Sequence, residues 1–158
     1  GMTIREVLEK VGGGVSEGER IKVLQAGGPL NGLLGEEAFD TMIDFDAMSA
    51  AGASIGSGGI IVGNETVNVV DLLRSLIAFN QFESCGKCFP CRIGTQRLTE
   101  RLDQNTIEID LETWTNEVNE IGEVMKATSA CGLGMAAPNV TESLQKYFHD
   151  TINTYVKK

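Results

Sequence analysis

The chain has 158 residues and a mass of 16.9 kDa, which fits one domain of average size or two small ones. Its 22 acidic and 13 basic residues give a net charge of −9, which argues against nucleic acids and anionic membrane surfaces as partners. No apolar run approaches the roughly 18–20 residues that span a bilayer, and the first residues lack a secretory signal. We therefore expect a cytoplasmic protein without direct membrane insertion, either free or at the periphery of a membrane complex.

The first part of the chain predicts a helix followed by short strands. Apolar residues recur at helical spacing over residues 4–11, Thr3 is a suitable N-cap, and Glu6 completes a capping box. Three glycines at residues 12–14 favour the end of this helix. Strands separated by glycine-containing turns are predicted at residues 21–24, 42–45 and 60–62. One helix packed across such strands indicates a small α+β sheet domain.

The second part predicts four amphipathic helices. Apolar stripes with spacings of three and four residues run through residues 67–79, 92–102, 111–125 and 140–155. Pro90 suits the first position of the second helix, where a missing N–H has little effect. Four such helices with short connections indicate a four-helix bundle.

Glycine and cysteine are distributed differently between these two parts. Fourteen of the 19 glycines lie in residues 1–63, whereas all four cysteines lie beyond residue 84. This change of composition predicts one domain over residues 1–64 and a second over residues 65–158.

The four cysteines form the clearest chemical pattern. Cys85, Cys88 and Cys91 are separated by two residues each, and 39 residues lie between Cys91 and Cys131. A cubane iron–sulfur cluster needs one thiolate for each of four irons, which three close cysteines and a distant one can supply. Disulfides, a structural zinc site and unrelated buried thiols are the alternatives. The spacing favours the cluster, because structural zinc sites usually pair two C-x2-C knuckles or one knuckle with two histidines.

Residues around the cysteines suit an anionic cluster. Lys87 and Arg92 place positive charge beside the thiolates, with ordinary solvated charge as the alternative interpretation of both. Gly86, Gly132 and Gly134 allow backbone N–H groups to approach the sulfur atoms, and such hydrogen bonds tune the reduction potential. We expect these residues to surround the metal site.

The cysteine segments also carry a family resemblance. Residues 83–92 (ESCGKCFPCR) resemble a signature of the NADH-binding flavoprotein subunit of complex I, shared by related subunits of NAD(P)-linked hydrogenases and formate dehydrogenases. Residues 129–134 (SACGLG) resemble the distal cysteine segment of that family, and residues 135–139 are closer to its hydrogenase branch. Residues 27–29 and 56–62 resemble, more loosely, the ubiquitin-like β-grasp domain of soluble-ligand-binding type that precedes the cluster domain.

The resemblance implies an electron-transfer module. In the family, the four cysteines hold a [4Fe–4S] cluster in a C-terminal helical domain, and FMN and NAD(P)H bind an N-terminal domain that would precede residue 1. The chain is then expected to be the C-terminal part of a larger oxidoreductase subunit, truncated within its sheet domain and inactive alone. It would pass electrons from the flavin/NADH domain of the same parent chain to other iron–sulfur subunits. The alternative is a subunit-docking module in which the cysteines hold structural zinc.

Overall fold

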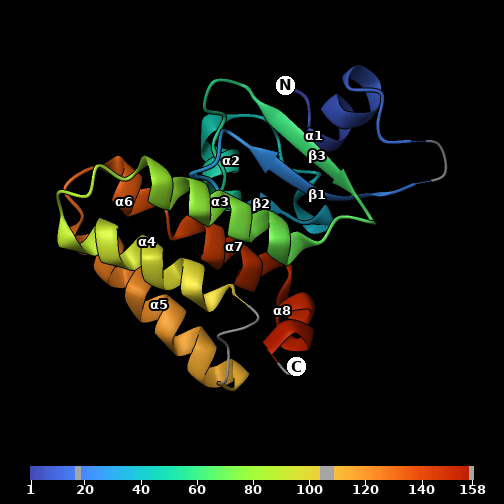
Figure 1. Ribbon diagram of the computed structural model, residues 1–158. Coiled ribbons are helices and arrows are strands. Elements are labelled where there is room, and N and C mark those ends of the chain that lie inside the picture. Colours follow the sequence, from blue (N-terminus) through green and yellow to red (C-terminus); the bar gives the residue numbers. More distant parts are fainter. Residues whose placement is uncertain (17–18, 104–108, 157–158) are drawn as a thin grey trace.

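A small sheet and a layer of longer helices make up the structure (Figure 1). The computed structural model describes residues 1–16, 19–103 and 109–156. The sheet and its short helices come from the N-terminal part of the chain, and the longer helices come from the C-terminal part. The predicted α+β class is confirmed.

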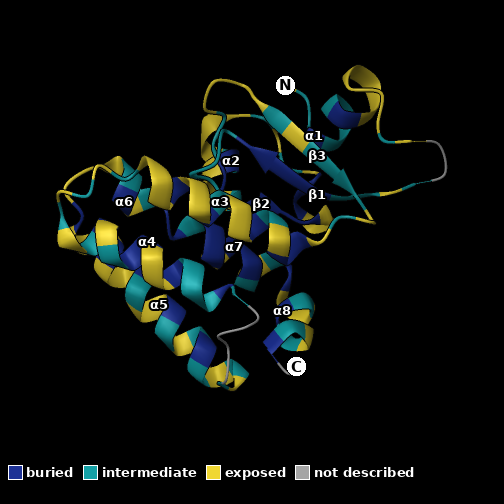
Figure 2. Ribbon diagram, in the orientation of Figure 1, coloured by how far each residue is buried: buried dark blue, intermediate teal, exposed yellow. Residues whose placement is uncertain are grey.

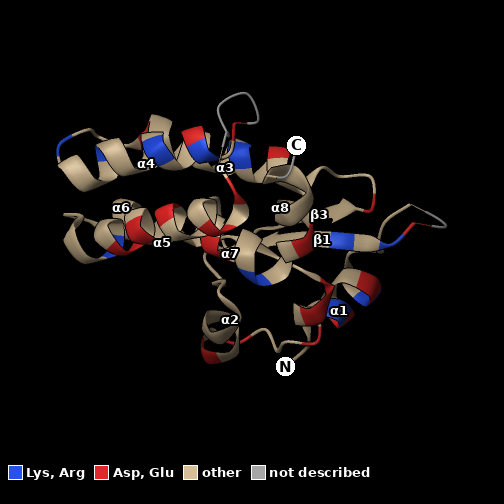
Figure 3. Cartoon of the chain, turned by 90° about the horizontal axis from the view of Figure 1, so that it is seen from below, with Lys and Arg blue, Asp and Glu red and all other residues tan. Residues whose placement is uncertain are grey.

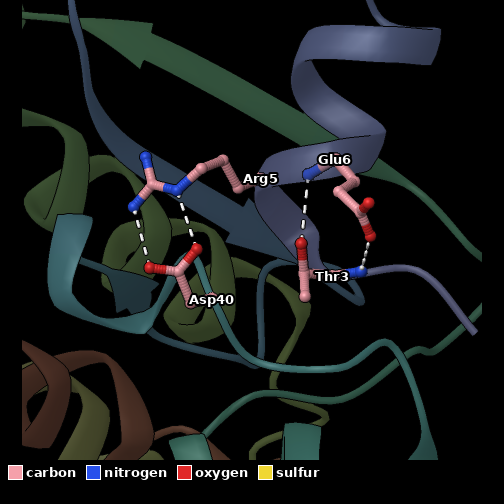
Figure 4. A network of polar contacts seen from close by, with 4 residues as sticks. All are labelled: Thr3, Arg5, Glu6 and Asp40. Atoms are coloured by element: carbon pink, nitrogen blue, oxygen red, sulfur yellow. Dashed lines mark hydrogen bonds and ion pairs between the residues drawn. The ribbon is translucent and has the colours of Figure 1, made fainter.

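The first helix begins at its predicted cap. The Thr3 N–H donates to Glu6 Oε2 (3.1 Å), and the Glu6 N–H donates to Thr3 Oγ1 (3.2 Å), which completes the capping box (Figure 4). Helix α1 (Ile4–Glu6) continues into a π-helical turn, η1 (Val7–Val11), that ends before the three glycines. The predicted helix is therefore confirmed in position, although its second half is wider than an α-helix.

An ion pair ties this helix to the segment that follows the second strand. Arg5 Nε and Nη2 donate to the two carboxylate oxygens of Asp40, at 2.8 and 3.2 Å (Figure 4). The Arg5 guanidinium also lies 5.8 Å from the centroid of the Phe39 ring. The hydrogen bond from Arg5 holds the pKa of Asp40 below its ordinary value.

The sheet has three antiparallel strands. Strand β1 (Ile21–Ala26) lies between β2 (Leu33–Leu34) and β3 (Ile60–Asn64), and Leu24 pairs with a residue of each neighbour. A 3-10 turn, η2 (Glu36–Ala38), follows β2. Apolar side chains of the sheet and its helices form one buried cluster, which comprises Ile4, Leu8, Leu24, Ala26, Leu34, Ala38, Phe39, Met48 and Ala53.

The strand predicted over residues 42–45 is wrong. Asp44 is instead the N-cap of helix α2 (Phe45–Ala51), and its Oδ1 accepts a hydrogen bond of 2.8 Å from the Ala47 N–H. Met42 forms only an isolated bridge with the residue that caps α1. The N-cap hydrogen bond to Asp44 favours a helix here, although the short apolar run is typical of a strand. The other two predicted strands are confirmed within β1 and β3, whereas β2 was not predicted.

Within the described residues, six helices follow the sheet, where the sequence predicts four. They are α3 (Val69–Glu83), α4 (Phe89–Arg101), α5 (Leu111–Thr128), α6 (Gly132–Ala136), α7 (Asn139–Tyr147) and α8 (His149–Val156). The first three predicted stripes correspond to α3, α4 and α5. The fourth is divided at Phe148, whose φ of −134° and ψ of 35° are not helical, and α6 was not predicted. Pro90 is the second residue of α4, because this helix begins at Phe89.

The buried core of the helices includes residues of the sheet. Val23 of β1 and Leu33 of β2 belong to the same apolar cluster as buried residues of the helices. Figure 2 shows buried segments in both the sheet and the helices. Trp114, the single tryptophan of the chain, is 1% exposed, and its Nε1–H donates to the Arg101 carbonyl at 2.7 Å. The helical residues of the cluster are Val69, Val70, Leu73, Ile77, Leu98, Leu102, Trp114, Val118, Met125, Ala137, Val140, Leu144, Phe148, Ile152 and Val156.

Polar contacts also join the two parts. Tyr147 Oη donates to the Ala51 carbonyl at 2.5 Å, and Lys146 Nζ donates to the same oxygen at 3.1 Å. On the other side of the sheet domain, Lys22 Nζ donates to the Val67 carbonyl at 2.9 Å. These bonds join α2 to α7 and strand β1 to the segment before α3.

Charges of both signs are mixed on the helical surface (Figure 3). Arg97 pairs with Glu100 at 2.8 Å within α4, and Lys126 of α5 pairs with Glu142 of α7 at 2.6 Å. Among the described residues, no helix is both long enough and apolar enough to cross a membrane.

Candidate metal centre

Two loops bring the four cysteines to the same end of the helices. Cys85 lies in the loop between α3 and α4, Cys88 caps α4, and Cys91 lies in its first turn. Cys131 caps α6, directly after the segment that ends α5. The α3–α4 turn and α6 lie together at one end of the structure in Figure 1. The structure therefore brings together cysteines that 39 other residues separate in the sequence.

Electrostatic contacts connect all four thiols. Burial raises the pKa of Cys91, the hydrogen bond with Ser84 opposes this, and the charges of Cys88, Cys131 and Cys85 raise it further. The backbone N–H of Ala130, followed by that of Cys91, lowers the pKa of Cys88. Since Ala130 precedes Cys131, Cys88 lies near the second cysteine loop.

Exposure differs strongly among the cysteines. Cys91 is 4% exposed, Cys88 is half-buried, and Cys85 and Cys131 are exposed. All four are free thiols, so no pair of them forms the disulfide that was one alternative. Within residues 1–16, 19–103 and 109–156, no three His, Cys, Asp or Glu side chains are arranged around one point as ligands of a metal ion.

The first cysteine loop is held by a short series of hydrogen bonds. Gly86 has a φ of +71°, which glycine adopts readily, and its N–H donates to Ser84 Oγ at 3.3 Å. Arg92 Nη1 donates to the Gly86 carbonyl at 2.6 Å. Arg92 therefore spans the loop and stabilises it through this hydrogen bond, in addition to supplying a positive charge. Lys87 is exposed at the tip of the loop.

Two serines beside the cysteines were not singled out from the sequence. Ser84 Oγ lies 3.2 Å from Cys91 Sγ. Ser129 is 5% exposed, and its hydroxyl has no hydrogen-bond partner among the described residues. Both lie inside the motif segments, immediately before Cys85 and two residues before Cys131, which is the one signal that could have indicated them.

Gly132 and Gly134 take different positions in α6. Gly132 is exposed, and the Cβ atom that it lacks would meet nothing within 4 Å. Gly134 is buried, and its missing Cβ would come within 2.8 Å of Cys91 Cβ. The single histidine, His149, is exposed at the start of α8.

Comparison with known proteins gives a family match over the helices. The family described as "NADH-ubiquinone oxidoreductase-F iron-sulfur binding region" matches residues 71–155. The HndC component of an NADP-reducing hydrogenase from Solidesulfovibrio fructosivorans is 35% identical over 156 residues, covering 99% of this chain and 32% of that protein. The F component of an NADH-quinone oxidoreductase from Rickettsia typhi is 33% identical over 162 residues, covering 99% and 38%.

The fold also matches a solved structure. An NAD+-reducing [NiFe]-hydrogenase in the H2-reduced state superposes with a TM-score of 0.81 and 22% identity, over 99% of this chain and 26% of that one. The chain spans about a third of the length of the curated relatives it matches.

Proposed function

The chain belongs to the family of NADH-ubiquinone oxidoreductase-F iron-sulfur binding regions, and we propose that it carries electrons within an NAD(P)H-linked oxidoreductase. The cofactor of this family region is an iron–sulfur cluster, of the [4Fe–4S] type. When bound, such a cluster accepts and releases single electrons. The observation that supports the proposal is that the α3–α4 turn and α6 lie at one end of the helices (Figure 1), where the backbone of Gly134 in α6 approaches Cys91 of α4.

Cys85, Cys88, Cys91 and Cys131 are the proposed ligands. A single zinc ion would hold four sulfurs at about 2.3 Å from one centre. A cubane instead takes one thiolate at each of four irons, so its ligands stand around a larger body. The chain offers four free thiols, three around the α3–α4 turn and one at the start of α6, which is one for each iron of such a cluster.

The surrounding residues would support the anionic site. Lys87 and Arg92 supply positive charge, and Arg92 also holds the loop through the Gly86 carbonyl. Gly86 and Gly132 leave the backbone near the thiols free of side chains. Burial of Cys91 keeps water from one corner of the site, which strengthens electrostatic interactions there.

Exposed apolar residues at the cysteine end of the molecule support a proposal for its partners. Phe82 and Phe89, on either side of the cysteine loop, are 84% and 66% exposed, and Met135 of α6 is 42% exposed. Apolar side chains so close to a redox site suit contact with another protein. We propose the flavin/NADH domain of the parent chain, where FMN and NAD(P)H would bind, and other iron–sulfur subunits. A cytoplasmic position, free or peripheral to a membrane complex, stays a prediction.

A finer description of the fold is also a proposal. The three-stranded sheet over residues 1–64 would be a β-grasp domain of soluble-ligand-binding type. The helices over residues 65–158 would be a four-helix bundle of α3, α4, α5 and the α7–α8 pair. The antiparallel sheet order and the resemblance of the glycine turns support this division.

Metal analysis of the 158-residue chain tests the function. After anaerobic reconstitution with iron and sulfide, we expect about four irons and four sulfides per chain, with little zinc. The reduced protein should then transfer single electrons to an added [2Fe–2S] ferredoxin. One zinc per chain with no uptake of iron would favour the structural docking module instead.

A further inference from the structure

A buried hydroxyl without a partner lies beside the most buried cysteine. Ser129 ends α5, and its own N–H donates to the Met125 carbonyl at 3.1 Å. Its Oγ, by contrast, is buried and has no hydrogen-bond partner within the part of the chain that the structure describes. Buried hydroxyls are nearly always paired, so this one is free to donate to a group bound beside it.

Gly134 shows where this hydroxyl lies. The Cβ atom that Gly134 lacks would fall 2.7 Å from Ser129 Cβ and 2.8 Å from Cys91 Cβ, and closer still to Ser129 Oγ. The side chains of Ser129 and Cys91 therefore meet over the same glycine. The absence of a side chain at Gly134 makes room for both.

A second serine reaches the same cysteine from another helix end. Ser84 Oγ accepts the Gly86 N–H and lies 3.2 Å from Cys91 Sγ. A thiolate has no proton to donate, so with Cys91 ionised the Ser84 hydroxyl must be the donor in this pair. One serine, Ser84, therefore already contacts Cys91. A second, Ser129, lies next to it, and its hydroxyl has no hydrogen-bond partner among the described residues.

We propose that Ser84 and Ser129 are positioning residues that donate hydrogen bonds to the sulfur atoms at the Cys91 corner of the cluster and raise its reduction potential. This inference rests on the proposed function. Reduction adds one electron and makes the cluster more negative, and a donor at sulfur stabilises that state more than the oxidised one. Burial strengthens the effect, because solvent does not compete for the same sulfur.

The test compares Ser84→Ala and Ser129→Ala with the unmodified chain after reconstitution. The midpoint potential is measured by a redox titration followed by electron paramagnetic resonance, and hydrogen bonding by the deuterium shift of the iron–sulfur vibrations. Each variant is expected to keep its iron, to have a lower potential and to lose part of the deuterium shift. Thr128→Ala is the control, because Thr128 is exposed and its hydroxyl is already bonded to the Val124 carbonyl at 2.6 Å. Its potential should not change.

The outcomes separate this inference from the proposed function. If the unmodified chain takes up no cluster, the proposed function fails. If the alanine variants load normally and keep the original potential and deuterium shift, the inference alone is overturned. If the alanine variants do not load, Ser84→Thr and Ser129→Thr decide. If the threonine variants bind the cluster with the original potential, the hydroxyl groups have the proposed role. If the threonine variants also fail to bind the cluster, the site depends on the size of the side chain, and the inference is overturned.

Discussion

The N–H of Leu33 donates to Ser143 Oγ at 2.9 Å, which joins strand β2 to helix α7 across 110 residues of sequence. The Ser143 hydroxyl in turn donates to the Val140 carbonyl at 2.8 Å. This buried hydroxyl therefore pairs with both the sheet and its own helix. The contact leaves no room at Gly32, where a Cβ atom would overlap the Ser143 side chain.

Gly32→Ala is expected to destabilise the protein by about 1–3 kcal/mol, the usual range for overpacking. The added methyl group must push α7 away from β2, since the atoms that it meets belong to Ser143 and to the Asn139 backbone. Urea unfolding measures the change. Gly59→Ala is the matched control, because a Cβ there meets nothing within 4 Å. Equal stability of the two variants would contradict close packing at Gly32.

Asp40→Asn should reduce stability slightly at neutral pH and have no effect in acid. Because Arg5 lowers the folded-state pKa of Asp40, the ion pair stabilises the protein above the unfolded-state pKa of about 3.9. That stabilisation is lost as the pH falls through the lower folded-state pKa. Thermal unfolding between about pH 7 and pH 2 measures the difference. Asp46→Asn, also exposed, controls for the loss of one charge. A difference that persists at the acid end would contradict the ion pair.

Serine in place of any one of Cys85, Cys88, Cys91 or Cys131 is expected to abolish most cluster binding. Loss of a ligand should exceed the roughly 10–100-fold weakening caused by loss of an outer-shell contact. Iron and sulfide per chain are the measurement, and Ser75→Ala, on the exposed face of α3, is the handling control. Full iron content in any of the four variants would remove that cysteine from the ligand set.

Gly134→Ala should impair cluster uptake, whereas Gly94→Ala should affect stability alone. Both glycines are buried in helices, and both substitutions overpack by about 1–3 kcal/mol at most. The methyl group at Gly134 meets the Ser129 side chain and Cys91 Cβ, but at Gly94 it meets the Met125 side chain. Iron content and thermal stability are measured together. Equal iron content in the two variants would show that Gly134 is not needed for the site.

Several elements could be predicted because their signals are local. The capping box at Thr3 and the stripe through α5 each lie within one stretch of sequence. Strand β2 has only two residues, so it depends on pairing with β1 rather than on any pattern of its own. The break at Phe148 could not be predicted either, because apolar spacing continues through it and both α7 and α8 pack against α3 and α5.

For the candidate site, too, local signals could be predicted from the sequence and contacts between distant segments could not. The cysteine spacing is a local signal, and it predicts the proposed ligands and their charged neighbours. The proposed roles of Ser84 and Ser129 depend on how the ends of α3 and α5 pack against α4 and α6. The spacing of residues along the sequence does not predict this packing. Arg92 was predicted as a charge, and its hydrogen bond to Gly86 depends on the turn of the loop.

The burial of Trp114 gives the protein a built-in optical probe. Its indole lies within the helical core and is hydrogen-bonded to the end of α4, so its emission should be that of a tryptophan shielded from water. With a single indole in the chain, tryptophan fluorescence reports the packing of α5 against α4. Separation of the two helices would expose the indole to water and shift its emission to longer wavelength.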